Sequence, residues 1–264
     1  MNRKLLMNRR RLLGLGAASA STLLLSGCDW FDGGLGMGDG LRSTLEKAND
    51  VSYRVQRLLA GQQALAHEYD ESEIRQGQRP NGSTDPQGDE YLALKANKFA
   101  DYKLKITGLV NKELSLSLAD LKSMPSRTQI TRHDCVEGWS CIAKWTGTPL
   151  AAVLDQAKVK PTAKYCLYQC FDTLDGGLSG QVPYYETSDL IDARHPQTIL
   201  AYGMNDAALP IANGAPIRVR IERALGYKQA KYVHTIQLVD HFEDVGAGRG
   251  GYWEDVGYDW YGGI

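Results

Sequence analysis

The stretch from residue 131 to residue 150, TRHDCVEGWSCIAKWTGTPL, constrains the fold more than any other part of this chain. Its apolar residues keep no single helix or strand period, and Gly138, Gly147 and Pro149 exclude one long helix. A thiol beside acid and imidazole groups, walled by Trp139 and Trp145, is typical of a reactive site. Free cysteine is equally typical of a packed interior. The residues of this stretch alone leave both interpretations open.

Short strands and short helices alternate irregularly along the rest of the chain, which predicts an α+β fold. Residues 103–108 alternate polar and apolar side chains as a strand does. Ser117, with Asp120 three residues later, predicts the start of a short helix over 117–122. We further expect strands over 128–132, 164–171, 200–204, 217–221 and 232–239, helices over 44–69, 150–157 and 187–193, and irregular segments over 75–88 and 246–264.

Composition is that of a soluble globular protein, with 43% hydrophobic and 23% charged residues among 264. The formal net charge of −1 conceals an asymmetry, because residues 1–27 hold five of the 30 basic residues and none of the 31 acidic ones. The remainder carries a net charge of −6, which excludes a broad basic surface for nucleic acid.

The first 27 residues have the pattern of an export signal. Three arginines at 9–11 precede an apolar run over 12–25 that is too short for a membrane span. Paired arginines before two leucines resemble a twin-arginine (Tat) signal, whose route carries folded proteins to the periplasm, often with a cofactor already inserted. We therefore expect a periplasmic protein.

The signal ends in Leu-Ser-Gly before Cys28, which resembles a lipoprotein cleavage site and predicts lipidation of Cys28. Asp29 resembles the retention signal of inner-membrane lipoproteins. The alternative is an ordinary signal that leaves Cys28 unmodified. Residues 28–43 form a Gly-rich tether, followed by one catalytic domain over 44–245 and an irregular tail over 246–264.

Four cysteines lie in the body of the chain. The spacings of Cys135 with Cys141 and of Cys166 with Cys170 do not match the tight pairs of structural zinc sites. On one strand Cys166 and Cys170 would lie about 13 Å apart, which is beyond the reach of a disulfide. Residues 246–251 contain G-x-G-x-x-G, but no helical pattern follows, so we assign them to the tail.

Several separated motifs resemble the sulfite oxidase-type molybdopterin-binding oxidoreductase family. Residues 133–140 (HDCVEGWS) and 145–150 (WTGTPL) match its core, and 208–218 (ALPIANGAPIR) and 226–231 (GYKQAK) follow in the family's order. The most similar branch is the monomeric periplasmic one that includes the protein-methionine-sulfoxide reductase catalytic subunit. The resemblance covers about residues 104–239, and it implies a mixed α+β fold and a molybdenum–molybdopterin (Mo-MPT) cofactor.

The resemblance also implies roles for individual residues. Cys135 takes the place of the thiolate that binds molybdenum, and a soft sulfur anion suits that metal centre. Cys170 stands where the methionine-sulfoxide reductase branch has a threonine that contacts the cofactor. Asn81 and Gly82 are candidates to complete the pterin pocket, although no motif marks them. The positions that hold the pterin and its phosphate are matched by Asn213, Arg218, Gln229, Ala230 and Lys231.

The implied reaction is oxygen-atom transfer, and Glu137 is the candidate for moving the accompanying proton. Its alternative role is that of a structural carboxylate bonded to nearby backbone. Asp134 and Glu137 flank the thiolate with only Arg132 opposing them, which favours a neutral S-oxide or N-oxide over the sulfite anion.

Electrons must come from another protein, because the sequence has no haem motif. A membrane b-type cytochrome fits an anchored protein, and a c-type cytochrome is the alternative donor. The sequence stops at Ile264, soon after the last shared strand and before the dimerisation domain of the dimeric branch, so we expect a monomer. Two other functions stay open: sulfite oxidation, and a non-catalytic pterin-binding lipoprotein, against which an intact Cys135 argues.

Overall fold

The computed structural model describes residues 48–49, 51–58, 61, 63–75, 77, 79–175 and 180–264. The predicted export signal, the lipidation site Cys28 and the tether lie outside these described residues. The chain divides into two compact units, Met1–Ser52 and Tyr53–Ile264. The fold given below is that of the second unit.

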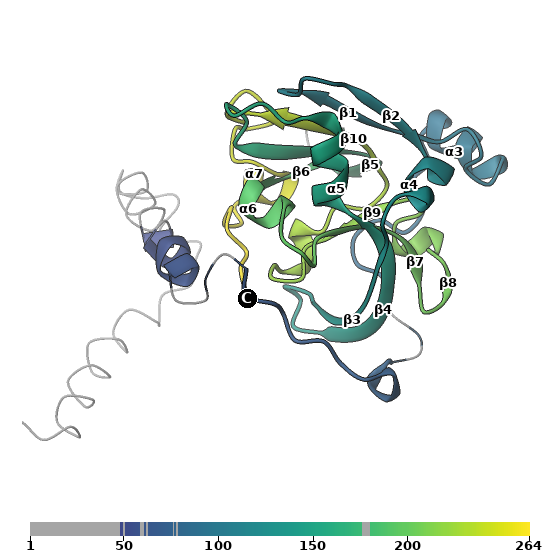
Figure 1. Cartoon of the computed structure of the whole chain (residues 1–264), viewed down its shortest axis with the longest axis horizontal. Coiled ribbons are helices and arrows are strands. Elements are labelled where there is room, and N and C mark those ends of the chain that lie inside the picture. The colour runs from purple at the N-terminus through teal and green to yellow at the C-terminus, as the bar shows by residue number, and fades with distance from the viewer. Residues whose placement is uncertain are drawn as a thin grey trace, which may run out of the picture. The chain divides into compact units, whose positions relative to one another are not determined.

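The first sheet has five strands, with β1 and β10 paired in parallel and every other neighbouring pair antiparallel. The predicted strand over 103–108 is confirmed as β1, in which Leu104 and Ile106 are buried between exposed lysines. The sheet lies in the upper part of Figure 1. Its spatial order is β2 (Leu114–Ser117), β1 (Lys103–Gly108), β10 (Val233–Val239), β5 (Tyr165–Asp175) and β6 (Gln181–Asp189).

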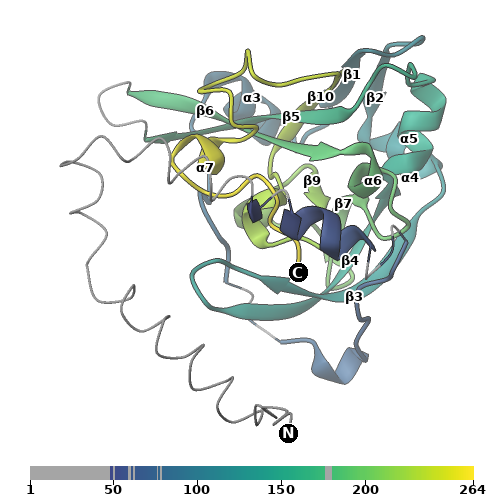
Figure 2. The same ribbon diagram turned by 90° about the vertical axis from the view of Figure 1, so that its left-hand side faces the viewer.

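The second sheet is built on the hairpin of β3 (Arg127–Asp134) and β4 (Ser140–Pro149). β4 pairs antiparallel with β7 (Ile199–Met204), which also pairs with β8 (Ala207–Ala208) and β9 (Arg218–Arg220). Figures 1 and 2 both place β7 and β9 between the first sheet and the hairpin. The stretch over 131–150 is therefore mostly a hairpin, in which Gly138 has φ +83° within the turn.

Local signals predicted two helices correctly. α4 (Leu118–Ser123) begins at Ser117, whose side chain accepts a hydrogen bond from the Asp120 backbone N–H. α5 (Leu150–Ala157) has the predicted bounds. The remaining short helices are η2 (Glu71–Glu73), α3 (Asp89–Ala96), α6 (Leu190–Ala193), η4 (Ile211–Asn213), η5 (Gly226–Lys228) and α7 (Tyr252–Asp255).

Two predicted helices were wrong in part. The helix expected over 44–69 does not extend through 63–69, because the chain turns at Gly61 (φ +75°) and the following backbone bonds to other elements. The Tyr69 N–H donates to the Ile130 carbonyl of β3 at 2.9 Å. The helix expected over 187–193 is confined to α6, since 187–189 pair with β5 as the end of β6.

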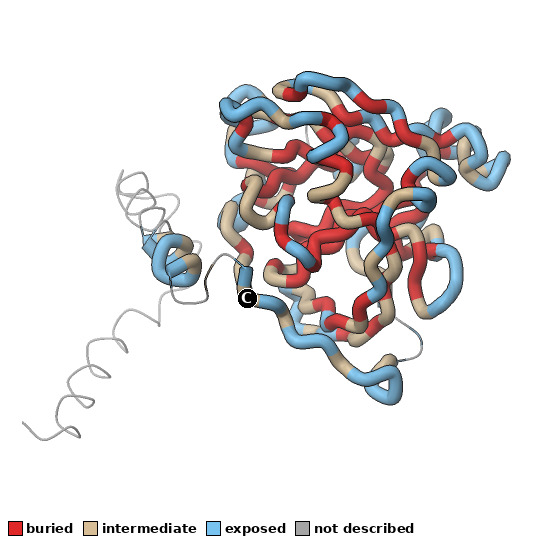
Figure 3. Tube along the Cα trace, in the orientation of Figure 1, coloured by how far each residue is buried: buried red, intermediate tan, exposed pale blue. Residues whose placement is uncertain are grey.

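The core lies between the two sheets, where most buried segments in Figure 3 run. α5 buries Leu150, Val153 and Leu154 against it. The tail is irregular as predicted, apart from α7, and an isolated bridge between Glu186 and Gly251 joins it to β6. None of the described helices is long and apolar enough to cross a membrane.

Candidate active site

A cavity of about 620 Å³, which includes the space at its open mouth, lies beside the turn that joins β3 to β4. Residues 135–137 of the turn line it together with 81–83 of the irregular segment. Its other walls come from β5, from β6, from the segment over 226–231 and from the tail.

Cys135 is the first residue of the turn. Its backbone N–H donates to the Trp139 carbonyl at 2.9 Å, and its carbonyl accepts from the Gly138 N–H at 3.0 Å. The thiol is half-buried and is not part of a disulfide. Burial raises the pKa of Cys135, and a backbone hydrogen bond from Glu137 acts in the opposite direction. A cation or metal at the thiol would favour the thiolate that this burial disfavours.

Glu137 lines the same cavity and is held by two neighbours. The Trp139 indole N–H donates to Glu137 Oε2 at 2.9 Å, and Arg79 Nη2 lies 3.5 Å from the same oxygen. The Arg79 guanidinium lies over the Trp139 ring, 5.5 Å from its centroid, which is within the reach of about 6 Å of a cation–π contact. The Glu137 carboxylate is exposed to solvent, and these two contacts hold it on the cavity lining beside Cys135.

Lys231 supplies a buried cation to the cavity. Its ammonium donates to the backbone carbonyls of Asn81, Ser83 and Ala212, and within the described residues no carboxylate lies in ion-pair range. Burial, with a smaller effect of Arg218, lowers the pKa of Lys231 to about 7. Asp172 also lines the cavity, but burial raises the pKa of its carboxyl group, which weakens its ability to balance Lys231.

Arg218 is a second buried cation beside Lys231. Its guanidinium donates to the carbonyls of Asn213 (3.1 Å) and Gln229 (3.3 Å) and lies 5.1 Å from the Trp145 ring centroid. Nε has no hydrogen-bond partner among the described residues. Burial and the nearby Arg220 lower the pKa of Arg218 to about 9. Two buried cations bonded only to neutral groups are expected to bind an anion.

Glycine packing holds the two cations together. Gly214 adopts φ +114°, and a Cβ there would lie 3.0 Å from the Lys231 side chain and 3.1 Å from that of Arg218. Asn213 precedes this glycine at the end of η4. Gln229 lines the cavity and donates to the Ala224 carbonyl at 2.9 Å, while its Oε1 has no partner within the described part of the chain.

The structure thus brings six of the predicted site residues to one cavity: Asn81, Gly82, Cys135, Glu137, Gln229 and Lys231. Three other predicted residues lie buried behind this lining. Ala230 lies between Gln229 and Lys231 in the chain, and Arg218 packs beside Lys231 at Gly214. Asn213 accepts a hydrogen bond from Arg218 through its carbonyl oxygen. Cys170 is buried on β5, two residues before Asp172, and is not on the lining. Its contact with a cofactor stays a prediction.

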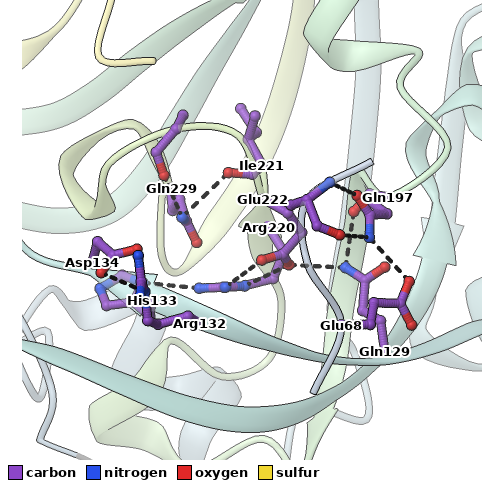
Figure 4. A network of polar contacts seen from close by, with 12 residues as sticks. Glu68, Gln129, Arg132, His133, Asp134, Gln197, Arg220, Ile221, Glu222 and Gln229 are labelled. Atoms are coloured by element: carbon purple, nitrogen blue, oxygen red, sulfur yellow. Dashed lines mark hydrogen bonds and ion pairs between the residues drawn. The ribbon is translucent and has the colours of Figure 1, made fainter. Parts of the chain in front are cut away.

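A buried polar network joins the end of β3, which leads into the turn, to β9 (Figure 4). Arg220 donates to His133 Nδ1 at 2.8 Å and forms an ion pair with Glu222 at 2.6 Å, with both charged side chains fully buried. Gln129 donates to Glu222 at 2.8 Å. Arginine can only donate, so His133 carries its proton on Nε2. Burial, with Arg220 second, keeps the pKa of His133 well below its usual value.

The aromatic part of the cavity lining differs from the one that the sequence predicted. Neither of the predicted walls, Trp139 and Trp145, is on the lining. Trp145 is buried in a second apolar cluster with Ile199 and Ala201 of β7, and contacts the guanidinium groups of Arg218 and Arg220. The aromatic side chains on the lining come instead from residues far away in sequence: Tyr184, Tyr227, Trp253 and Tyr258. For the two tail residues, the density of tyrosine and tryptophan over 246–264 was a signal in the sequence that could have predicted an aromatic contribution.

The sequence model of one family, the oxidoreductase molybdopterin binding domain, matches residues 91–245. This chain therefore belongs to the molybdopterin-binding oxidoreductases and is an enzyme of that class, as its motifs predicted. Its two-sheet α+β architecture is that of the sulfite oxidase-type domain.

The names of related proteins specify a narrower class of enzyme than the family does. A subunit from Azospira oryzae, provisionally named protein-methionine-sulfoxide reductase subunit YedZ1, is 32% identical over 255 residues, which are 97% of this chain and 87% of the relative. The protein-methionine-sulfoxide reductase catalytic subunit MsrP of Gluconobacter oxydans is 37% identical over 148 residues, or 53% of this chain and 47% of the relative. MsrP of Xanthomonas campestris pv. campestris is 32% identical over 180 residues, or 66% and 54%.

The chain therefore spans about half the length of these two MsrP subunits. Among solved structures, the sulfane dehydrogenase SoxCD from Paracoccus pantotrophus aligns with a TM-score of 0.46 and 23% identity, over 53% of this chain and 39% of that chain.

Proposed function

We propose that this protein is an exported Mo-MPT enzyme that reduces a neutral S-oxide or N-oxide by oxygen-atom transfer, with a methionine sulfoxide as the favoured substrate. The observation that carries the proposal is the shared cavity of the Cys135 thiol and the buried Lys231 ammonium, with Arg218 beside it. A soft sulfur ligand and an uncompensated cation pair are complementary to a metal centre attached to an anionic organic group.

The residues fit this cofactor in their chemistry. Cys135 would bind molybdenum, while Lys231 and Arg218 would bind the phosphate of the pterin. Arg218 Nε is buried with no hydrogen-bond partner in the described part of the chain, so it has a bond to offer a ligand. When bound, the cofactor supplies a centre that exchanges one oxygen atom and two electrons.

Reduction of an S-oxide consumes two electrons and two protons, and releases a thioether and water. Glu137 is placed to hold one of these protons on its carboxylate beside Cys135. Arg79 and the Trp139 indole bind the same carboxylate oxygen and fix its direction. Its exposure provides a path for reprotonation from solvent.

Two observations favour a neutral substrate over sulfite. Tyr227, Trp253 and Tyr258 give one side of the cavity an aromatic surface. The relatives named above are protein-methionine-sulfoxide reductase subunits, whose substrate is neutral and carries a thioether carbon skeleton. An aromatic surface binds such a group through apolar contact and offers no charge to an anion.

The export signal supports a periplasmic location by the Tat route, with a lipid anchor at Cys28 and a monomeric catalytic domain. A membrane b-type cytochrome is then the natural electron donor, because both partners would lie at the same membrane surface, and a c-type cytochrome is the alternative. The name of the Azospira relative as a subunit is consistent with a separate redox partner.

The test combines composition with activity. Protein exported in a molybdenum-replete host should contain molybdenum and pterin, and Cys135→Ala should lose the metal, whereas Cys141→Ala, in β4, should retain it. The loaded protein should oxidise a reduced viologen when methionine sulfoxide is added. Rapid oxidation of sulfite with no turnover of sulfoxides or N-oxides would refute the proposed substrate, and absence of pterin would refute the enzyme itself.

A further inference from the structure

The tail forms an aromatic side of the cavity. Trp253 and Tyr258 both line it, and their ring centroids lie 5.3 Å apart at an interplanar angle of 30°. Tyr227 of η5 meets Tyr258 edge-on, also at 5.3 Å. The buried cation Lys231 lines the same cavity. The cavity therefore offers an aromatic surface as well as a polar, cationic one, and these suit different ligands.

A buried ionic cluster holds the tail in place. Glu254, adjacent to Trp253 on α7, and Glu186 of β6 both accept hydrogen bonds from the Lys228 ammonium. All three side chains are buried. Lys228 lies between Tyr227 and Gln229, which both line the cavity. The cluster therefore connects the tail to the segment over 226–231 and to β6 of the first sheet.

The cluster is closely packed. A Cβ at Gly251 would overlap Glu254 Oε2 and lie 2.8 Å from Glu186 Oε1, so a larger residue there would have to displace both carboxyl groups. Burial and the charge of Glu254 raise the pKa of Glu186 well above its usual value. Protonation of Glu186 relieves the repulsion between the two neighbouring carboxyl groups.

A second set of bonds fixes α7 from its other side. Asp255 Oδ2 accepts from the Tyr185 hydroxyl at 2.6 Å and from the Ala247 N–H at 2.9 Å. Asp255 Oδ1 accepts from the Arg249 N–H at 3.2 Å. A helix of four residues is not stable alone, so these two sets of contacts are what hold it.

We propose that Trp253 and Tyr258 determine substrate specificity by binding the thioether side of the S-oxide, and that Lys228, Glu186 and Glu254 position this aromatic wall. The proposal rests on the proposed function, because it names the part of the cavity that selects the substrate. Aromatic rings contact a methylthio group favourably along their faces and edges. A wall fixed before the substrate arrives adds affinity without an ordering cost.

The first test is kinetic and uses the loaded full-length enzyme. Trp253→Ala should raise KM for a methionine-sulfoxide peptide about tenfold, with kcat within about twofold, because the wall contacts the substrate skeleton and not the reacting atoms. KM for dimethyl sulfoxide, which has less surface to contact, should rise less. Trp253→Phe should restore most of the peptide affinity, and Val256→Ala, at an exposed tail residue, should change neither KM.

The second test is structural and does not depend on activity. Glu254→Gln, which removes a charge at constant shape, should speed backbone hydrogen exchange over 251–258 at least about tenfold, with exchange in β1 unchanged. Glu243→Gln, at an exposed residue of the same region, should leave both unchanged.

The outcomes separate the two proposals. Wild-type enzyme that reduces no S-oxide overturns the proposed function and the specificity role with it. Wild-type enzyme that reduces the peptide, with a Trp253→Ala variant whose ratio of the two KM values is unchanged, overturns the specificity role alone. Unchanged exchange over 251–258 in Glu254→Gln overturns the positioning role of the cluster.

Discussion

Replacing Arg218 by methionine should stabilise the cofactor-free protein while abolishing cofactor retention. The side chain is buried, and its guanidinium donates only to carbonyl oxygens. Burial and the nearby Arg220 lower the pKa of Arg218 from its ordinary value to about 9. A lowered pKa in a basic group means that folding disfavours its charged form, so the cost is fully present at every pH below about 9.

The size of the effect follows from the same contacts. One pKa unit corresponds to about 1.4 kcal/mol, so the buried charge costs the folded state about 5 kcal/mol. The Arg218→Met substitution removes two hydrogen bonds to carbonyl oxygens, about 1 kcal/mol each, and a cation–π contact with Trp145 of about 1 kcal/mol. The net gain is about 2 kcal/mol, which raises Tm by about 4–8 °C for a chain of this size.

The assay is thermal unfolding of protein made in a host that cannot synthesise molybdopterin, together with pterin analysis from a normal host. Arg220→Met is the matched control, because the same change two residues away leaves Glu222 buried without its partner. That variant should lose about 3–5 kcal/mol. If Arg218→Met lowers Tm as Arg220→Met does, or keeps its pterin, Arg218 is not a cation reserved for a bound anion.

Three further predictions concern other parts of the molecule. Lys231 has a pKa of about 7 when folded and about 10.4 when unfolded, so the unfolded chain binds more protons between these values. The cofactor-free protein should therefore gain stability as pH rises through that window, and Lys231→Met should show a flatter pH profile of Tm. Gly226→Ala would place a Cβ 2.6 Å from His133 Nε2, and should cost about 1–3 kcal/mol of unfolding free energy in denaturant titrations. Cys28→Ser should abolish incorporation of labelled palmitate and move the protein from the membrane fraction to the soluble periplasmic fraction; labelling that persists in this variant would exclude Cys28 as the anchor.

The sequence predicted secondary structure correctly where the signal and the element it sets lie within a few residues of each other. The alternation over 103–108 forms β1, and Ser117 with Asp120 caps α4, because both signals act within a few residues. The prediction of a helix over 44–69 was wrong beyond Gly61, because contacts with distant segments decide the structure there. Its apolar spacing suits a helix, but the chain from 63 onward forms hydrogen bonds with β3 and Gln197.

The candidate site was predictable in its chemistry but not in its shape. Cys135, Arg218 and Lys231 stand in motifs whose residue types state what they can bind, and the structure places them around one cavity or directly behind its wall. Sequence could not place Trp145 beneath Arg218 and Arg220, or Trp253 on the cavity, because both positions depend on packing between distant segments.

The sequence by itself therefore determined the class of enzyme, the thiol expected to bind the metal and the cations expected to bind a phosphate. These properties belong to individual side chains and to motifs read along the chain. Only the tertiary structure decided that Arg218 is left without a carboxylate while Arg220 has one, and that a buried Lys228–Glu186–Glu254 cluster brings the tail to the cavity. The physical reason is that burial and pairing of charge are set by which segments meet in space.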